Sequence, residues 1–377
     1  MALQKGDYLF LSGHTASQYD SDSKKMVCKG NIIDQTIVAY EKIKLLVEAA
    51  GGSFDDVVKM TDYITPSGLE KYKYIGEVRH KYFNHSLPAV TPVVVHHLLR
   101  DALIEVEAVA VLGKSKKEVI NPAWRNYEEL ACSPAVKKGD LIFLSGQVGM
   151  DYKTGRIVDE DDIVAQTEKA YQNIEIILNA SGASYNDVVK TIDYISPKGL
   201  NNYKDAQKVR TRHFGKSYSA VTGVVIEQCL QKSALIGIDC IAVIGNQKKW
   251  GHRFGRTDDQ DLTYRPVVKK GKIVFISGMV SIDMDTNELI GKGDVAGQMN
   301  QIFINIDKML KLAGVNRNDI LKTADFVIPE TEENYRLTAD VRRDYFKESF
   351  PASTGVFVDE LLSEGFLIEV DVIAVAD

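Results

Sequence analysis

The chain has 377 residues, of which 45% are hydrophobic and 26% charged, and its formal net charge is −6. This composition is ordinary for a soluble protein of two or three domains, and the interspersed charges give no reason to expect nucleic-acid binding. No apolar run reaches about 18 residues, so we expect no membrane span. The start shows no signal-peptide pattern and the four cysteines form no C-x-x-C pair, so we expect a cytoplasmic protein without a disulfide scaffold or zinc ribbon.

The first predicted element is a strand over residues 7–13, where apolar residues alternate and a glycine turn ends the run. Its motif LFLSG, from Leu9, returns as IFLSG from Ile142 and as VFISG from Val274. The glycines that end the three motifs are 133 and 132 residues apart, at Gly13, Gly146 and Gly278. This spacing indicates an internal repeat far longer than the roughly 20 to 50 residues of a solenoid.

A helix is predicted next, over residues 35–50. Its apolar residues recur at helical spacing, and Gly51 supplies a left-handed stop. The same helix returns in the other repeats as AQTEKAYQNIEIILNASGA and GQMNQIFINIDKMLKLAGV. The helix therefore belongs to the repeated unit.

Three strands and a second helix complete the unit. Residues 57–65 form a β-branched strand closed by proline, residues 69–83 predict a helix, and residues 88–98 and 102–112 predict two last strands. All of these recur about 131 or 132 residues later, including one lysine and one aspartate of the β-branched strand in every repeat: Lys59, Lys190, Lys322, Asp62, Asp193 and Asp325.

The sequence therefore predicts an α+β protein of three tandem domains, at residues 1–114, 121–247 and 256–377, each with the order β-β-α-β-α-β-β. Two helices cover one face of a sheet and leave its other face in need of a partner. We expect the three units to close into an intramolecular pseudo-trimer with central sheets and outer helices, present as a monomer or as a dimer of pseudo-trimers. Each linker holds a tryptophan, Trp124 or Trp250, that we expect to dock.

Several motifs resemble the Rid (YjgF) family: LSGQVG, DVVKTIDYI, IEVEAVAV, a helix ending in AAGG and a PAVT segment. The resemblance covers nearly the whole chain, three times, and implies the Rid, chorismate-mutase-like fold with clefts between subunits. It also implies hydrolysis of imines or enamines to a keto acid and ammonia, with no metal and no organic cofactor. In that family an arginine in a P-A-R-x motif holds the substrate carboxylate, and a glutamate on the last strand positions water.

The chain departs from this pattern at the arginine. Its position holds Val90, Val221 and Ser353, so the resemblance implies a substrate without the usual carboxylate grip. The glutamate position holds Glu105, Gly237 and Glu369, so Glu105 and Glu369 are the candidate catalytic residues. The family's tyrosine and serine positions and the neighbouring polar residues give the candidate substrate-binding set: Tyr264, Cys132, Ser12, Ser277, Ser353, Thr91, Thr354 and His14.

The two candidate glutamates each precede a second acid by two residues, as Glu105 precedes Glu107 and Glu369 precedes Asp371. Residues two apart on a strand share one face. Adjacent carboxylates raise one pKa and create a general acid or base. The alternative is a polar face at a sheet edge or a structural salt bridge. The second acid occurs in all three repeats, which indicates a structural role for it.

The other candidates each carry an alternative. His14 could form an acid–base pair with Glu105, and Cys132 could be a nucleophile if a base lies nearby, although a buried inert cysteine is the commoner case. The threonines could bind substrate or cap a strand turn. His96 and His97 are adjacent, so on a strand they would face opposite ways and form no simple metal pair. The arginines of the second helix could replace the lost anchor, but packing and surface pairing is the commoner role: Arg79, Arg210 and Arg342.

Two functions therefore stand side by side. The first is a metal-free hydrolase or deaminase that acts on a small nitrogenous metabolite in a cleft between domains. The alternative is a non-catalytic metabolite-binding or regulatory protein, which the missing arginines favour. The acidic charge argues against ribonuclease activity. Because the three sets of candidate residues differ, we expect the three clefts to be inequivalent.

Overall fold

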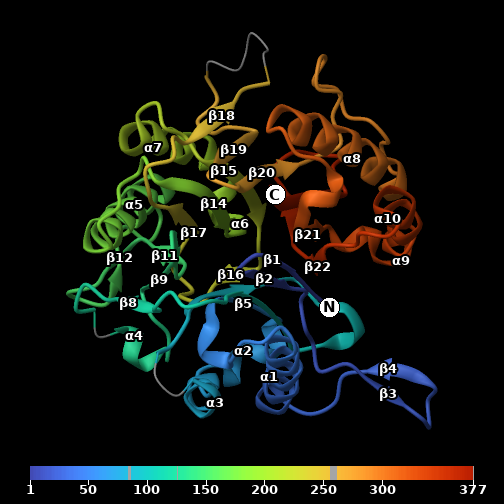
Figure 1. Cartoon of the computed structure of the whole chain (residues 1–377), viewed down its shortest axis with the longest axis horizontal. Helices are drawn as coiled ribbons and strands as arrows, with labels where there is room; N and C mark the ends of the chain where they lie inside the picture. The colour runs from blue at the N-terminus through green and yellow to red at the C-terminus, as the bar shows by residue number, and fades with distance from the viewer. Residues whose placement is uncertain (84–85, 125, 255–260, 377) are drawn as a thin grey trace.

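The computed structural model describes residues 1–83, 86–124, 126–254 and 261–376. The predicted start of the third domain, residue 256, lies outside these residues. Figure 1 shows three α/β units around a common centre, with the sheets inward and the helices outward. No helix in the described parts of the chain is both long and apolar enough to cross a membrane.

The first domain follows the predicted order of elements, with three differences. A short ribbon, β3–β4, was not predicted. The second helix is broken into α2 and α3, and the strand predicted over residues 88–98 ends at Val94. The elements of this domain are β1 (Ala2–Lys5), β2 (Tyr8–Leu11), β3 (Gln18–Asp20), β4 (Lys25–Val27), α1 (Ile32–Ala49), β5 (Val57–Ile64), α2 (Pro66–Tyr72), α3 (Ile75–Tyr82), β6 (Ala89–Val94) and β7 (Ile104–Val111).

The second domain repeats this plan, and a segment with one short strand and one helical turn precedes it. Its elements, with those of that segment first, are β8 (Glu118–Ile120), α4 (Asn126–Glu129), β9 (Ala135–Lys138), β10 (Leu141–Leu144), β11 (Gln147–Val148), β12 (Met150–Asp151), β13 (Arg156–Ile157), α5 (Ile163–Ala180), β14 (Val188–Ile195), α6 (Pro197–Leu200), α7 (Tyr203–Phe214), β15 (Ala220–Val225), β16 (Gln228–Cys229) and β17 (Ile236–Val243).

The third domain has the same core. Its elements, preceded by the linker strand β18, are β18 (Trp250–His252), β19 (Val267–Lys270), β20 (Ile273–Met279), α8 (Val295–Leu312), β21 (Ile320–Val327), α9 (Glu332–Tyr335), α10 (Thr338–Phe346), β22 (Ala352–Phe357), β23 (Glu360–Leu361) and β24 (Ile368–Val375). Trp124 stacks on Tyr152 at 3.9 Å between ring centroids, as expected of a docked residue. Trp250 is 38% exposed, so its predicted docking is wrong.

The sheets are joined across the domain boundaries. The first sheet has the order β1-β2-β7-β5-β6-β16, and its last strand comes from the second domain. Likewise β23 of the third domain extends the second sheet beside β15. Within the sheet of each domain one pair of strands is parallel, and the other pairs are antiparallel. The parallel pairs are β5–β6, β14–β15 and β21–β22, whose two strands flank the second helix of each domain. Neighbouring domains are thus linked by main-chain hydrogen bonds.

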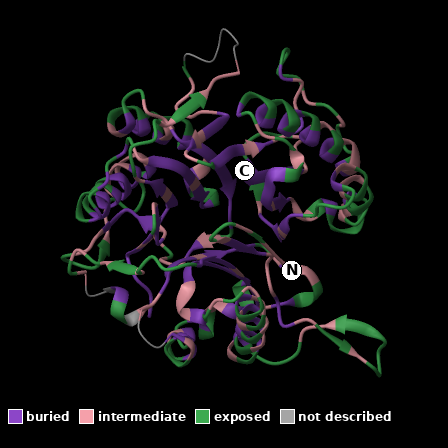
Figure 2. Ribbon diagram, in the orientation of Figure 1, coloured by how far each residue is buried: buried purple, intermediate pink, exposed green. Residues whose placement is uncertain are grey.

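Each sheet is buried on both faces. On β10, Ile142 and Leu144 pack against the helices of their own domain, whereas Leu141 and Phe143 enter a core shared by all three domains. This split follows from the alternation of side chains along a strand. Figure 2 shows the result as buried strands in the middle of the molecule and exposed outer faces on the helices.

Three buried lysines tie the domains together beside this core. Lys59 of the first domain lies 2.8 Å from Asp239 of the second, and Lys322 of the third lies 2.7 Å from Glu107 of the first. Lys190 of the second domain pairs with Asp371 of the third. Each lysine also donates to a carbonyl of the same neighbouring domain, those of Leu144, Ile276 and Leu11. We call these three ion pairs the lysine ring.

A second set of cross-domain ion pairs repeats the cyclic pattern nearer the surface. It consists of Lys138–Asp56, Lys270–Asp187 and Lys5–Asp319, at 2.6 to 2.8 Å. Among the described residues, every seam between two domains therefore carries at least two lysine–carboxylate pairs.

Removing one member of the lysine ring should destabilise the chain. Lys190→Met leaves the buried Asp371 unpaired, which costs about 3 kcal/mol or more. Lys198→Met, at an exposed pair with Asp161, should cost less than about 1 kcal/mol. Midpoints of urea unfolding measure both effects. The double variant Lys190→Met/Asp371→Leu should regain stability, and equal midpoints for the two single variants would contradict a structural role of the ring.

Candidate functional site

A cavity between the second and third domains brings candidate residues together. Its volume is about 150 Å³, and it is lined by Arg210 and Val221 of the second domain and by Tyr264 and Glu369 of the third. We call it the 2/3 cleft. Val221 stands where the resemblance predicts an arginine, so an apolar group replaces a cation in this wall. The structure thus places one candidate glutamate and the candidate tyrosine in one cavity.

The carboxyl group of Glu369 packs directly on the glycine turn. A Cβ atom at Gly278 would lie 1.6 Å from Oε1 of Glu369. At Gly13 the corresponding distance to Oε1 of Glu105 is 1.8 Å. Glycine is needed in these turns because the carboxyl group occupies the space of a side chain. The sequence showed the glycine and the glutamate as separate motifs, and the structure joins them.

Both glutamates are buried, which changes their acidity. Burial raises the pKa of Glu369 to about 8; Asp371 adds to the rise, and Lys190 opposes it. Burial also raises the pKa of Glu105 to about 7, against the attraction of Lys322. Exposed carboxyl groups at a sheet edge, the alternative drawn from the sequence, are therefore ruled out. A carboxyl group with a pKa near neutrality is suited to moving protons.

The second acids do structural work, as the sequence indicated. Glu107, Asp239 and Asp371 are the carboxylates of the lysine ring. Both candidate threonines contact the same ring. Thr91 accepts a hydrogen bond of 2.6 Å from Lys59, and Thr354 accepts one of 2.5 Å from Lys322 and donates to Glu107.

The candidate serines hold the seams between domains. The hydroxyl of Ser277 accepts from the backbone N–H of Val221 at 2.8 Å and donates to the carbonyl of Arg265. The hydroxyl of Ser12 accepts from the backbone N–H of Ser353 at 3.0 Å. The serine of the S-G turn thus bonds the residue at the missing-arginine position of the neighbouring domain. Substrate binding by these hydroxyls stays a prediction.

The seam between the third and first domains contains Glu105, whose side chain reaches Gly13 beside Thr354. His14 follows this glycine, and its backbone pairs with Val106. Within the described residues, no hydrogen bond joins His14 to Glu105, so the predicted acid–base pair is not formed. The Nε2 atom of His14 is buried without a hydrogen-bond partner, and burial lowers its pKa to about 4. The imidazole is therefore neutral at physiological pH.

The seam between the first and second domains has a different chemistry. Its cavity of about 170 Å³, the 1/2 cleft, is lined by Cys132, Tyr127, Tyr152 and Gly237, with Gly237 at the glutamate position. Gln147 donates to the Tyr127 hydroxyl at 2.7 Å and accepts from the Tyr152 hydroxyl at 3.1 Å. Burial raises the pKa of Cys132 to about 11, so the thiol stays protonated and the proposed nucleophile is unsupported.

The two tyrosines of the 1/2 cleft were missed by the sequence analysis. Tyr127 lies on α4, in a segment that read as a weakly patterned linker, and Tyr152 follows the two-residue strand β12. The position of Tyr127 has no tyrosine in the third repeat. Tyr152 lies six residues after Gly146, as Tyr19 lies six residues after Gly13, so the repeat offered a signal for Tyr152 alone.

The arginines of the second helix are paired inside their own domains. Each forms an ion pair with the repeated aspartate of the neighbouring strand: Arg79 with Asp62, Arg210 with Asp193 and Arg342 with Asp325. Arg210 also donates to the hydroxyls of Tyr203, Tyr171 and Thr263. Packing and pairing is thus the observed role, although the pairs are buried rather than on the surface. The Arg210 charge that reaches the 2/3 cleft is already compensated.

The raised pKa of Glu369 gives a stability test. An unfolded glutamate titrates near 4.3, so between about pH 4.3 and 8 the folded chain holds a proton that the unfolded chain has released. Stability then falls as pH rises through this window. Glu369→Gln cannot ionise and should be more stable than the parent at pH 8.5, by an amount on the order of a few kcal/mol, and little changed at pH 5.

Urea unfolding at the two pH values measures this difference. Glu348→Gln, at an exposed loop position, serves as the control and should shift neither midpoint. If the midpoints of urea unfolding of the parent and of Glu369→Gln differ by the same amount at pH 5 and at pH 8.5, the raised pKa of Glu369 is contradicted.

Similarity to solved structures extends across all three units. A chorismatase crystal structure matches with a TM-score of 0.53 over 85% of this chain and 93% of that chain, at 16% sequence identity. At this identity the match shows a shared fold alone.

Curated relatives match single domains. A RutC family protein of Pyrococcus abyssi is 41% identical over 110 residues, which are 29% of this chain and 84% of that protein. Reactive Intermediate Deaminase A, chloroplastic, of Arabidopsis thaliana is 33% identical over 129 residues, or 34% and 67% of the two chains. A 2-iminobutanoate/2-iminopropanoate deaminase of Dermatophagoides farinae is 32% identical over 112 residues, or 30% and 84%.

The family model described as Endoribonuclease L-PSP matches the chain three times, over residues 1–112, 127–244 and 259–376. These matches cover most of the chain and follow one another without overlap. The chain therefore belongs to the Endoribonuclease L-PSP family, the Rid family of its motifs, and carries three tandem copies of the family domain.

Proposed function

We propose that this chain is a deaminase that hydrolyses the carbon–nitrogen bond of a small, uncharged imine or enamine, and that the 2/3 cleft is its active site. The observation that carries the proposal is the buried Glu369 carboxyl group, with a pKa of about 8, in a cavity that also holds Tyr264. The deaminases among the relatives support the class of reaction.

In the proposed reaction Glu369 moves protons between water and nitrogen. Its ionised form takes a proton from a water molecule as the water oxygen bonds to the imine carbon. Glu369 returns this proton to the nitrogen, which gives a neutral amino alcohol. As the amino alcohol collapses, its hydroxyl proton passes through Glu369 to the departing nitrogen, so that imine and water give a carbonyl compound and ammonia. A group whose pKa lies near the working pH can both accept and return this proton. Tyr264 would orient the substrate.

The charges around the cleft favour an uncharged substrate. Arg210 is compensated by Asp193, and Val221 offers no cation at the missing-arginine position. A substrate carboxylate would therefore enter beside Glu369 with no uncompensated cation among the described residues that line the cleft, which is unfavourable for a buried charge. The lack of a carboxylate separates the proposed substrate from the 2-imino acids in the name of the Dermatophagoides farinae relative.

The 1/2 cleft favours binding without catalysis. It is the larger of the two cavities, it is lined by Tyr127 and Tyr152, and Gly237 supplies no carboxyl group. Aromatic side chains of this kind bind small planar molecules through stacking and hydroxyl contacts. We therefore propose a ligand-binding role for this cleft, alongside the active 2/3 cleft.

Substitution of the two glutamates tests the active site. Ammonia release is measured with a panel of imines, enamines, amides and ureides. Glu369→Gln should lower kcat/KM by about 10² or more, since general acid–base groups contribute about 10² to 10⁴. Glu105→Gln should retain most of the activity, and Glu348→Gln all of it. If both cleft variants match the parent chain, the carboxyl mechanism is wrong.

The pH profile gives a second test of the same group. Because the ionised form of Glu369 accepts the proton, kcat/KM should rise about tenfold per pH unit up to about pH 8 and then level off. Glu369→Gln should lose this rise. A parent profile that is flat between pH 6 and 8 would assign the chemistry to another group.

Binding at the 1/2 cleft is tested in the Glu369→Gln background, which should bind without turnover. Val148→Trp fills the 1/2 cleft, because Val148 lines it. Equilibrium dialysis of the substrate panel should show a bound compound whose affinity falls about tenfold or more with Val148→Trp, as expected for a blocked cavity. Unchanged binding of every panel compound would rule out this cleft as a binding site for these compounds.

A further inference from the structure

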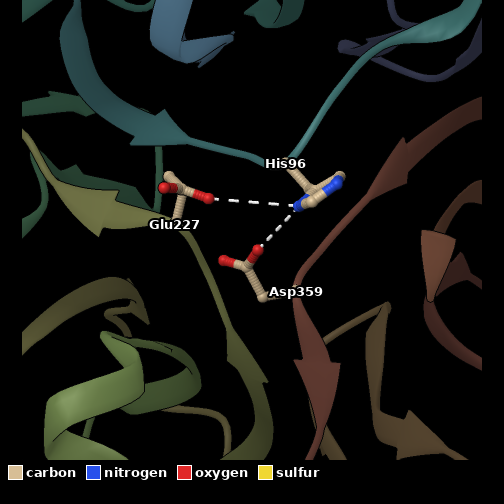
Figure 3. Close-up of side chains that lie close together, drawn as sticks. All are labelled: His96, Glu227 and Asp359. Carbon is tan, nitrogen blue, oxygen red and sulfur yellow. Dashed lines mark hydrogen bonds and ion pairs between the residues drawn. The ribbon is translucent and has the colours of Figure 1, made fainter.

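Three polar side chains meet where the three domains come together, and they occupy one position of the repeat. His96, Glu227 and Asp359 are 131 and 132 residues apart in the chain. Each is the second residue after the end of a strand, β6, β15 or β22. Figure 3 shows the three side chains pointing toward one another from three separate segments. One domain thus supplies an imidazole, and the other two supply carboxylates.

The distances suit a small cation. Nδ1 of His96 lies 2.9 Å from Oδ1 of Asp359 and 4.0 Å from Oε2 of Glu227. One nitrogen or oxygen from each side chain lies within 4.8 Å of the other two. Ligands at about 2.0 to 2.2 Å from a tetrahedral zinc ion stand roughly 3.4 Å apart. The three atoms therefore stand near the separations that ligands of one shared ion require.

The backbones that carry these side chains are fixed to one another. The N–H of His96 donates to the carbonyl of Phe357 at 3.0 Å, and the N–H of Asp359 donates to the carbonyl of Val225 at 3.0 Å. Gln228, next to Glu227, pairs with Val94 of β6. Main-chain hydrogen bonds between domains therefore hold the three positions before any ligand binds. Such preorganisation lowers the ordering cost of binding.

The charges of the cluster are incompletely balanced. Among the described residues, the ion pairs of Glu227 and Asp359 all involve His96, and no lysine or arginine takes part. Two carboxylates therefore lie close together with one imidazole between them. The Oδ2 atom of Asp359 is buried and has no hydrogen-bond partner. An unsatisfied buried carboxylate oxygen is costly, and a bound cation would satisfy it.

We propose that His96, Glu227 and Asp359 form a binding site for a divalent transition-metal ion, with zinc as the ion tested. One imidazole and two carboxylates are ligands that zinc accepts, and water would complete its four-coordinate shell. His96 and Glu227 are 46% and 43% exposed, so the ion can enter from solvent. None of the three residues lines the 2/3 cleft, which separates this site from the proposed active site.

Because each domain provides one ligand, the ion would act as a clamp. An ion that binds only the folded chain raises its stability by RT ln(1 + c/Kd), where c is the concentration of the free ion, so the rise grows with the logarithm of concentration over Kd. The inference is independent of the proposed deaminase activity, since it rests on a different set of residues.

Calorimetric titration of the full chain, stripped of metal with a chelator, with zinc chloride tests the site. The parent should bind one zinc ion per chain at this site and show a higher melting temperature with zinc. His96→Ala and Asp359→Asn should each weaken binding by at least about tenfold, as expected when a ligand is lost, and should abolish the shift in melting temperature.

The matched control is His80→Ala, which removes an exposed histidine of α3 that is not part of the cluster and should bind zinc like the parent. Circular dichroism checks that each variant is folded. The proposal is overturned if the parent binds no zinc at millimolar concentration. It is also overturned if a folded His96→Ala variant binds zinc as the parent does, because the ion then sits elsewhere.

Discussion

The lysine ring is the interaction on which the rest of the molecule depends. Each buried lysine reaches from one domain into the next, where it meets a carboxylate and a carbonyl oxygen, and the third lysine closes the circle on the first domain. Burying six charged groups is favourable only if every one is paired. No domain can move away from its neighbours without leaving charges unpaired at two seams. The ring therefore fixes how the three sheets face one another, and so fixes the clefts between them.

Burial is the main reason that the candidate glutamates are poor acids, and the ring adds two opposing charges beside each of them. Lys190 lies near Glu369, but it is committed to Asp371 at the next inward-facing position of β24. Glu369 thus has a compensated cation nearby and a carboxylate beside it, in a buried position where the charged form is disfavoured. Glu105 stands in the same relation to Lys322 and Glu107. The ring acid and the candidate glutamate occupy adjacent inward-facing positions of one strand, and burial together with the ring charges sets the pKa of the glutamate.

The sequence predicted features that depend on local periodicity and on the repeat. The alternation along IEVEAVAV placed Glu105 and Glu107 on one face, and the three-fold repetition of motifs gave the elements and the family. Contacts between repeats were beyond that reasoning. His96 and His97 were placed on a strand, but β6 ends at Val94, and His97 makes a single β-bridge with Phe357. The partners of His96 lie in the other two domains. The equal spacing of His96, Glu227 and Asp359 was present in the sequence, but strand pairing between domains was needed to bring them together.

Covalent linkage of the three units separates what the fold requires from what the chemistry requires. A substitution in a homotrimer alters all three clefts at once, whereas in this chain each cleft is formed by its own set of residues and can change separately. In the second domain the ring acid Asp239 is present while the neighbouring glutamate position is Gly237. A Cβ atom at Gly237 would make ordinary contacts of 3.6 and 3.8 Å with Cys229 and Val148, so packing does not force a glycine there. The seam keeps its ion pair between Asp239 and Lys59 although the 1/2 cleft has no carboxyl group at the glutamate position. The same logic predicts that substitutions at Glu105 and Glu369 affect activity more than the association of the domains. Substitutions at the ring acids should affect the association of the domains more than activity.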